Sequence, residues 1–415
     1  PGVSVATRSG DTDAEMRRRM LRHPPEILIT TPDSLNLLLS SRGGQTLLHD
    51  IDTLILDEVH AVVESKRGVY LMSAVERLVP MSGEFQRIAL SATVNPLDEV
   101  AGFIGGFRRS GSEFTARSVG VIQAPSNKTY EIGIRYPEDA ARRPDGEKIW
   151  DYLAADLLQR ISDNQSTLIF VNSRALCEKL AWRLNSTAGR LVAYAHHGSL
   201  SREIRADVEA RLKRGELEAI VATSSLEMGI DIGALDEVIL VQSPDSIASS
   251  IQRIGRAGHR VGAVSRGTLY PTHPQDFIES AVLSRAILER DIEPVQTVSG
   301  ALDVLAQVIV SMAGNDRWDL DELYQELRRS SVYHGLSRLE FDLVINMLAG
   351  RYGDHHIPEL KPRVRVDRID NTIEARRGAL LSLYMSGGVS PDRGYFQLRH
   401  ERDNARIGEL DEEFV

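Results

Sequence analysis

The chain has 415 residues, of which 42% are hydrophobic and 26% charged, and its formal net charge is −10. Such a composition is typical of a soluble globular chain, and the length predicts about two to four domains because single cores stop growing near ~250–300 residues. The negative net charge excludes a positive potential over the whole chain that would attract nucleic acid. Any binding of nucleic acid must therefore rest on local arginines and backbone amides.

No stretch of the sequence is apolar over the ~18 residues of a membrane span, and the first residues lack the basic and apolar segments of a signal peptide. We therefore expect a cytoplasmic chain with no membrane partner. The single cysteine, Cys177, falls within a helical pattern of leucines and is predicted to be a packing residue. One cysteine per chain excludes an internal disulfide or a cysteine-rich zinc site.

Residues 1–120 alternate short apolar runs with helical patterns, as βαβ units do. A strand is expected at 26–30, and Thr31 and Pro32 follow it and open a helix. Their position just past a strand suits contact with phosphate or a neighbouring loop. Taken alone, they are equally consistent with an ordinary helix cap.

The stretch 54–60 begins with three apolar residues and runs directly into Asp57 and Glu58, which predicts a buried parallel strand with two acids at its carboxyl end. Ligands of open α/β sheets bind at that edge. One carboxylate can hold Mg²⁺ and the other can orient and deprotonate an attacking water. The alternative is a strand that ends in an acidic turn.

A further strand at 87–90 ends in Ser91 and Thr93, whose hydroxyls are placed like those after 26–30. Residues 107–148 show no clear period and are predicted to form a linker and a peripheral hairpin. A second α/β unit begins near residue 150, with strands expected at 167–171, 217–222 and 237–241. Two similar lobes in tandem predict a ligand-binding cleft between them.

The segment 251–260 combines two glycines with arginines at a helix start. Glycine allows the backbone to approach phosphate, and an arginine there can stabilise transition-state charge as a finger. A basic, flexible loop is the alternative.

After residue 292 the pattern becomes helical, and residues 337–340 read Ser-Arg-Leu-Glu, a capping box. Three helices followed by a hairpin predict a winged helix, although a bare three-helix packing unit fits the same pattern. The predicted fold class is α/β, with two tandem RecA-like lobes, the first incomplete, followed by a winged helix and the start of a further domain. The expected limits are 1–120, 121–292, 293–375 and 376–415.

Taken together, these stretches resemble the motif series of superfamily 2 helicases in order and spacing. The resemblance covers most of residues 5–290 and is carried by residues 31–33, 57–60, 91–93, 172–174, 223–231 and 252–260. Within that superfamily the chain is similar to the Lhr (large helicase-related) family. That similarity is carried by residues 9–12, 31–35, 228–233, 256–259 and 406–415.

The resemblance implies an ATP- and Mg²⁺-dependent monomer that moves 3′ to 5′ on single-stranded DNA and unwinds DNA or RNA:DNA duplexes, often in DNA repair. It also assigns roles to individual residues. Asp57 would bind Mg²⁺, Glu58 would activate the hydrolytic water, and Arg256 would be the arginine finger. The other positions fall into three groups. The first group would couple the state of the nucleotide to binding of the nucleic-acid strand: His60, Ser91 and Thr93. The second would face the nucleotide: Gly229, Asp231, Gln252 and Arg260. The third would line the path of the strand: Thr31, Pro32, Asn172, Ser173, Arg174, His197 and Thr223.

Two departures from the family pattern stand out. His259 occupies the position where many superfamily members have a second arginine. In addition, no lysine follows a glycine, so the Gly-Lys-Ser/Thr loop that cradles phosphates is missing. The chain is therefore expected to be a fragment without that N-terminal segment and to show no DNA-stimulated ATPase by itself.

Two other hypotheses fit the same motifs. The chain could be a nucleic-acid-binding module without turnover, or the core of a helicase that remodels RNA. Because strand contacts run through phosphate and sugar, the sequence does not choose the duplex.

Overall fold

The computed structural model describes residues 2–92, 94–123, 128–142, 148–227, 235–258, 264–351, 361–386, 388–389, 395–399 and 406–411. The chain forms two compact units, and the first of them is built from separate segments. The first unit contains residues 1–91, 96–121 and 295–415, and the second contains 92–95 and 122–294.

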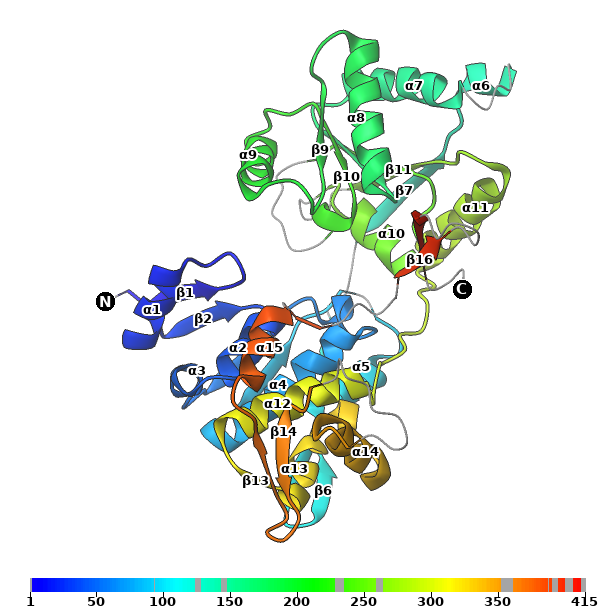
Figure 1. The fold of residues 1–415 in the computed structure, drawn as a ribbon. Coiled ribbons are helices and arrows are strands. Elements are labelled where there is room, and N and C mark those ends of the chain that lie inside the picture. The colour runs from blue at the N-terminus through cyan, green and yellow to red at the C-terminus, as the bar shows by residue number, and fades with distance from the viewer. Residues whose placement is uncertain are drawn as a thin grey trace. The chain divides into compact units, whose positions relative to one another are not determined.

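The second unit is organised around a parallel sheet that, as described, has six strands in the order β7-β12-β11-β8-β10-β9 (Figure 1). Its strands are β7 (Thr129–Ile134), β8 (Thr167–Val171), β9 (Ala193–His196), β10 (Ala219–Ala222), β11 (Glu237–Val241) and β12 (Val264–Tyr270). Its helices are α6 (Glu138–Arg142), α7 (Ile149–Asp163), α8 (Arg174–Ala188), α9 (Arg202–Lys213), η2 (Ser224–Leu226), α10 (Ile247–Ile254) and α11 (Pro274–Glu289).

Helices cover both faces of this sheet. Ile169 and Val171 of β8 point into a core shared with α7 and α8, whereas Leu168 and Phe170 point into a core shared with α9, α10 and α11. Side chains alternate along a strand, so four successive apolar residues of β8, 168–171, are needed to supply both cores. Cys177 lies buried in the first core, where its thiol donates to the Val221 carbonyl at 3.0 Å, and burial raises its pKa to about 11. The packing role predicted for Cys177 is confirmed.

The first unit contains shorter parallel pairs. They are β1 (Val5–Arg8) with β2 (Ile27–Thr30) and β3 (Thr53–Leu56) with β4 (Gln86–Ala89), followed by the antiparallel hairpin β5 (Phe107–Ser110) and β6 (Glu113–Ala116). The parallel direction of β3 is as predicted, but its predicted burial is only partly right. Leu56 is buried, whereas Ile55 is 60% exposed. Within the described residues β3 pairs only with β4, and the exposure of Ile55 shows that its face of the pair is uncovered.

The core of the first unit is centred on a helix, α4 (Lys66–Ser82), that is buried around most of its circumference. A helix that is apolar on all sides needs neighbours on all sides. α4 packs against α2 (Pro32–Leu39), α12 (Leu302–Asn315), α13 (Leu320–Leu327) and η3 (Ser331–Tyr333), the last three of which come from the C-terminal third of the chain. The other helices of the N-terminal segments are α1 (Ala14–Arg22), α2 (Pro32–Leu39), α3 (Arg42–Leu47), η1 (Val59–Ala61) and α5 (Leu97–Gly105).

A winged helix follows residue 300 and confirms the prediction. It combines helices with a three-stranded antiparallel sheet of order β13-β15-β14, as far as the structure is described. Ser337 and Glu340 form the expected capping box, whereas the short β13 was not predicted. The elements are α12 (Leu302–Asn315), β13 (Trp318–Asp319), α13 (Leu320–Leu327), η3 (Ser331–Tyr333), α14 (Arg338–Leu348), β14 (Val364–Asp367) and β15 (Thr372–Ala375), followed by α15 (Ala379–Ser386), β16 (Tyr395–Arg399) and β17 (Arg406–Asp411).

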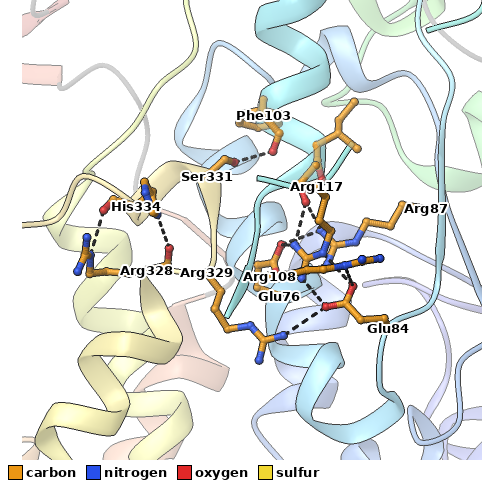
Figure 2. Close-up of polar contacts among 12 residues, drawn as sticks. Glu76, Glu84, Arg87, Phe103, Arg108, Arg117, Arg328, Arg329, Ser331 and His334 are labelled. Atoms are coloured by element: carbon orange, nitrogen blue, oxygen red, sulfur yellow. Dashed lines mark hydrogen bonds and ion pairs between the residues drawn. The ribbon is translucent and has the colours of Figure 1, made fainter. Parts of the chain in front are cut away.

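A buried ion cluster lies where the N-terminal segments meet the winged helix (Figure 2). Glu76 of α4 is only 3% exposed, and both of its carboxylate oxygens accept bonds from Arg87 and Arg117 at 2.7–3.2 Å. Arg117 also donates to Glu84, which lies 3.8 Å from Arg329 of the winged-helix segment. Because each buried charge has hydrogen-bonded partners of opposite sign, the cluster can exist away from water.

Candidate functional site

Asp57 and Glu58 lie at the carboxyl end of β3, as the sequence predicts. Glu58 adopts a left-handed backbone conformation, with φ 50° and ψ 44°, and its amide donates to Asp57 Oδ1 at 2.9 Å. Backbone bonds fix this turn on both sides, from Leu90 N to Leu56 O at 2.8 Å and from Val59 N to Leu90 O at 3.1 Å. A strained non-glycine residue that its surroundings hold in place is typical of a functional turn.

His60 links this turn to the end of β4. Its Nδ1 lies 3.3 Å from the hydroxyl of Ser91 and its Nε2 lies 3.5 Å from Glu58 Oε2. The His60 side chain is 9% exposed and that of Glu58 is 32% exposed, so the imidazole is the more enclosed of the two. The structure therefore brings three predicted site residues together. Thr93 lies outside the described residues.

The oxygen donors of this turn suit Mg²⁺ and a nucleotide. Asp57 is exposed, and no ion pair with lysine or arginine engages Asp57 or Glu58 within the described ranges. Among those same residues no group of three or more His, Cys, Asp or Glu could hold a metal ion. Mg²⁺ commonly takes only one or two protein carboxylates and completes its shell with water and phosphate oxygens, so the residues present fit.

Thr31 and Pro32 form the start of α2 directly after β2. The Thr31 hydroxyl accepts a bond from Ser34 N at 3.3 Å, and Pro32 occupies the first helical turn. The helix-cap interpretation is thus correct locally. Thr31 is half-buried, and capping uses its oxygen as an acceptor, which leaves its hydroxyl hydrogen to donate.

In the second unit, the exposed residues Asn172, Ser173 and Arg174 follow β8 at the start of α8. Asn172 Nδ2 donates to Ser243 O at 2.7 Å, and the Ser173 hydroxyl accepts from Leu176 N at 3.1 Å. These bonds hold a polar loop at the carboxyl edge of the sheet. Thr223 follows β10 at the same edge, where its amide donates to the His196 carbonyl at 3.2 Å.

His196, the last residue of β9, and His197, which follows it, are both buried. His197, which was predicted to line the strand path, is 6% exposed and pairs through Nε2 with Glu178 at 2.8 Å. Its neighbour His196 was not singled out, yet it lies 2.8 Å from the Ser225 hydroxyl and 3.1 Å from Glu209. Burial lowers the pKa of His196. Consecutive residues of a strand point to opposite faces, so this pair was a signal for two separate contacts.

The arginines of 252–258 converge on Glu227. Arg253 is 8% exposed, donates to Glu227 Oε2 at 2.9 Å and to Asn172 Oδ1 at 3.4 Å, and lies over the Phe170 ring. Arg256, the proposed finger, is half-buried and donates through Nε and Nη2 to the Glu227 carbonyl at 3.1 and 2.6 Å. Arg253 and Glu227 are thus site-forming residues that sequence reasoning missed.

Gln252, also on α10, is half-buried. Gly229, Asp231 and Arg260, together with His259, lie outside the described residues. Each unit therefore has its own polar group at the carboxyl edge of parallel strands, one around Glu58 and His60 and the other around Asn172 and Glu227.

Comparisons with known proteins match most of the chain to helicase domain families. Residues 2–100 match the DEAD/DEAH box helicase model, 150–261 the helicase conserved C-terminal domain, and 285–415 the winged helix domain of large helicase-related protein. The search for membrane spans, made over the described residues, found no helix with the length and apolar character to cross a bilayer.

Several relatives align with the whole chain, and two of them represent the range of coverage. An Lhr helicase and probable uracil glycosylase of Mycolicibacterium smegmatis is 40% identical, and the alignment covers 29% of that protein. The ATP-dependent helicase Lhr-Core protein 2 of Thermococcus barophilus is 37% identical, with 48% of its length covered. The chain thus spans about half the length, or less, of these relatives.

A solved structure of Mycobacterium smegmatis helicase Lhr bound to single-stranded DNA and AMP-PNP superposes with a TM-score of 0.86 at 40% identity. The match covers 97% of this chain and 52% of that one. The DUF1998 helicase MrfA is 18% identical with a TM-score of 0.61, a likeness of fold alone.

Proposed function

Because the chain belongs to the Lhr (large helicase-related) family of superfamily 2 helicases, we propose that it is part of an ATP-dependent helicase. The enzyme would move 3′ to 5′ on single-stranded DNA and unwind DNA or RNA:DNA duplexes in DNA repair, as a cytoplasmic monomer. The M. smegmatis relative, seen with single-stranded DNA and an ATP analogue, supports a nucleotide and a strand as ligands.

The turn at Glu58 carries this proposal. We propose that the Glu58 carboxylate takes the proton of the attacking water and that Asp57 beside it would hold Mg²⁺, which would neutralise charge on the phosphates. His60 contacts both Glu58 and Ser91, so a shift of the carboxylate on hydrolysis would reach the loop after β4. We propose that His60, Ser91 and Thr93 in this way couple the state of the bound nucleotide to the affinity for the nucleic-acid strand.

We propose that the second unit contributes the remaining nucleotide contacts. The Arg256 guanidinium is held through the carbonyl of Glu227, the last described residue before the segment with Gly229 and Asp231. Gln252 and Arg260 are proposed to face the phosphates, and Thr31, Pro32, Asn172, Ser173, Arg174, His197 and Thr223 to line the strand path.

The test is Glu58→Gln in a longer version that includes a Gly-Lys-Ser/Thr loop. The amide keeps the shape of the side chain and removes the base, so DNA-stimulated ATP hydrolysis should fall by about 10³ or more while binding of an ATP analogue stays near normal. Phosphate release and analogue affinity are measured in parallel. Turnover within a few-fold of the parent would sink the assignment of Glu58.

The substrate is tested with matched duplexes of DNA:DNA, RNA:DNA and RNA:RNA, each with a single-stranded 3′ or 5′ tail. We expect unwinding of the first two from the 3′ tail only. Preferential unwinding of RNA:RNA would favour an RNA-remodelling enzyme instead, and strand binding without ATP-dependent unwinding would favour a module that only grips.

A further inference from the structure

A cavity of about 170 Å³ lies inside the first unit, between α4 and the winged helix. None of its lining residues belongs to the turn at Glu58, and the cavity takes no part in the proposed nucleotide chemistry. Its walls mix apolar and polar side chains. They include Leu39, Arg77, Pro80, Trp318, Leu327 and Ser330.

The enclosed acids of this wall are already neutralised. Glu76 is held by the Arg87 and Arg117 guanidinium groups seen in Figure 2. Glu326 accepts bonds from Arg109 at 3.1 Å and from Arg329 at 3.2 Å. Asp316 is exposed, so water screens its charge. None of these carboxylates is paired with the remaining arginine of the wall, Arg77, in the described structure.

Arg77 is a guanidinium held by neutral groups alone. Its Nη2 donates to Leu39 O at 3.3 Å and to the Ser311 hydroxyl at 2.8 Å, whereas its Nη1 is buried with no hydrogen-bond partner among the described residues. Burial lowers the pKa of Arg77 to about 10. A buried charge without a counter-charge is costly, and native proteins rarely keep one without a reason.

Two more polar groups of the same wall are also buried without a partner in the described structure. They are the indole Nε1 of Trp318 and the hydroxyl of Ser330, a residue only 2% exposed. Buried indole N–H groups usually find an acceptor. Trp318 and Ser330 come from the winged-helix segment and Arg77 from α4, so these groups reach one cavity from both of its sides.

Water molecules could accept from these groups, but water does not neutralise a guanidinium. An acceptor with a negative charge does both. We propose that this cavity binds a small organic anion, with its carboxylate at Arg77, Trp318 and Ser330 and its apolar part against Leu39, Pro80 and Leu327. The volume is below the ~300–1,000 Å³ of sites for drug-sized molecules, so a ligand of about ten non-hydrogen atoms is the upper size.

Two probes of equal size test the role of charge. Phenylacetate presents a carboxylate on an apolar ring, and phenylacetamide replaces the carboxylate by a neutral amide. We expect phenylacetate to bind the chain with a Kd on the order of 1 mM, a value usual for such small ligands, and phenylacetamide to bind at least tenfold more weakly. Inorganic phosphate serves as a third probe, and binding at least as tight as that of phenylacetate would overturn the organic-anion assignment.

The site is located by the indole N–H resonances of the three tryptophans, with Trp318→Phe to assign its signal. Phenylacetate should shift the Trp318 resonance and leave those of Trp150 and Trp182 unchanged. Binding that shifts neither the Trp318 resonance nor any signal of α4 would place the ligand elsewhere and overturn the proposal.

Two variants separate charge from packing. Arg77→Gln should weaken phenylacetate binding at least tenfold and change phenylacetamide binding less than about twofold. Arg108→Gln controls for the loss of one positive charge, because the Arg108 side chain belongs to the same unit and is 66% exposed. If Arg77→Gln does not fold, Ser330→Ala carries the test and should weaken phenylacetate binding about threefold or more. Equal loss for both probes, or no loss in either variant, would contradict anion recognition.

Discussion

The parallel strands of the two units have the same kind of apolar sequence, but their faces are covered to different degrees. In the second unit β8 is buried at all five positions, because α7 and α8 cover one face and α9, α10 and α11 the other. In the first unit Ile29 of β2 is 53% exposed and Ile55 of β3 is 60% exposed. A short apolar run followed by polar residues thus predicts a parallel strand but not how much of it is covered.

The two units are therefore stabilised in different ways. The second has its core on a sheet, whereas the first has its core on α4 and on the winged-helix elements packed against it. The candidate hydrolytic turn lies on the less covered strands, and the proposed finger lies beside the fully covered ones. Each prediction below tests this contrast.

The largest effect is expected at the covered sheet. In a longer version with a Gly-Lys-Ser/Thr loop, Arg256→Ala should lower kcat by about 10³ or more if it acts as the finger. His259→Ala should cost much less, because neutral imidazole replaces a guanidinium poorly. Equal losses would mean that His259 or Arg260 shares the role, and kcat measured at low and high pH for both variants would separate those cases.

The next effect concerns what holds the first unit together. Glu76→Gln leaves two buried guanidinium groups facing a neutral amide, which should destabilise that unit by about 3–5 kcal/mol. Hydrogen exchange followed by mass spectrometry should show faster exchange in peptides of α4 and α12 and unchanged exchange in those of β8 and β11. Loss of protection in both units to the same degree would show that they do not unfold separately.

A smaller effect distinguishes the two sheets directly. Ile169→Val in β8 removes a buried methylene and should cost about 1 kcal/mol in urea unfolding. Ile55→Val, at the exposed position of β3, should lower the free energy of unfolding by only a few tenths of that amount, because the Ile55 side chain buries little apolar area on folding. Similar costs at the two positions would mean that β3 is covered in solution.

The smallest effect is expected with acid. Burial alone would raise the pKa of Glu237, but hydrogen bonds and the charge of Arg160 outweigh burial and lower it. A hydrogen bond from Arg117 lowers the pKa of Glu84. A lowered carboxyl pKa stabilises the fold above the unfolded value near 4.5 and loses that contribution as pH falls through the folded value. Both units should therefore lose stability below pH 4.5, and Glu237→Gln should flatten the pH dependence of the second unit alone.

Much of the fold could be predicted because its signals are local. The continuous apolar run of β8, the alternation at β14 and the capping box at Ser337 each depend on neighbouring residues. The clustering of Glu58, His60 and Ser91 follows from adjacent parallel strands that end at one edge.

Other features have no local signal. Arg87 and Arg117 follow Glu76 by 11 and 41 residues, and nothing near any of the three indicates that they share one buried cluster. The exposure of Ile55 depends on which elements cover β3 rather than on β3 itself. Arg253 and Glu227 had a partial signal, since the three-residue spacing of Arg253 and Arg256 places both near one side of a helical turn.

The division of the first unit into separate segments has a consequence for synthesis on the ribosome. Arg109, Glu84 and Phe103 are made before residue 121, but their partners Glu322, Arg329 and Ser331 follow only after residues 122–294. At ~5–20 residues per second that interval is on the order of tens of seconds. The second unit can form its sheet meanwhile, whereas α4 stays without its winged-helix neighbours and is the segment that a chaperone would find exposed.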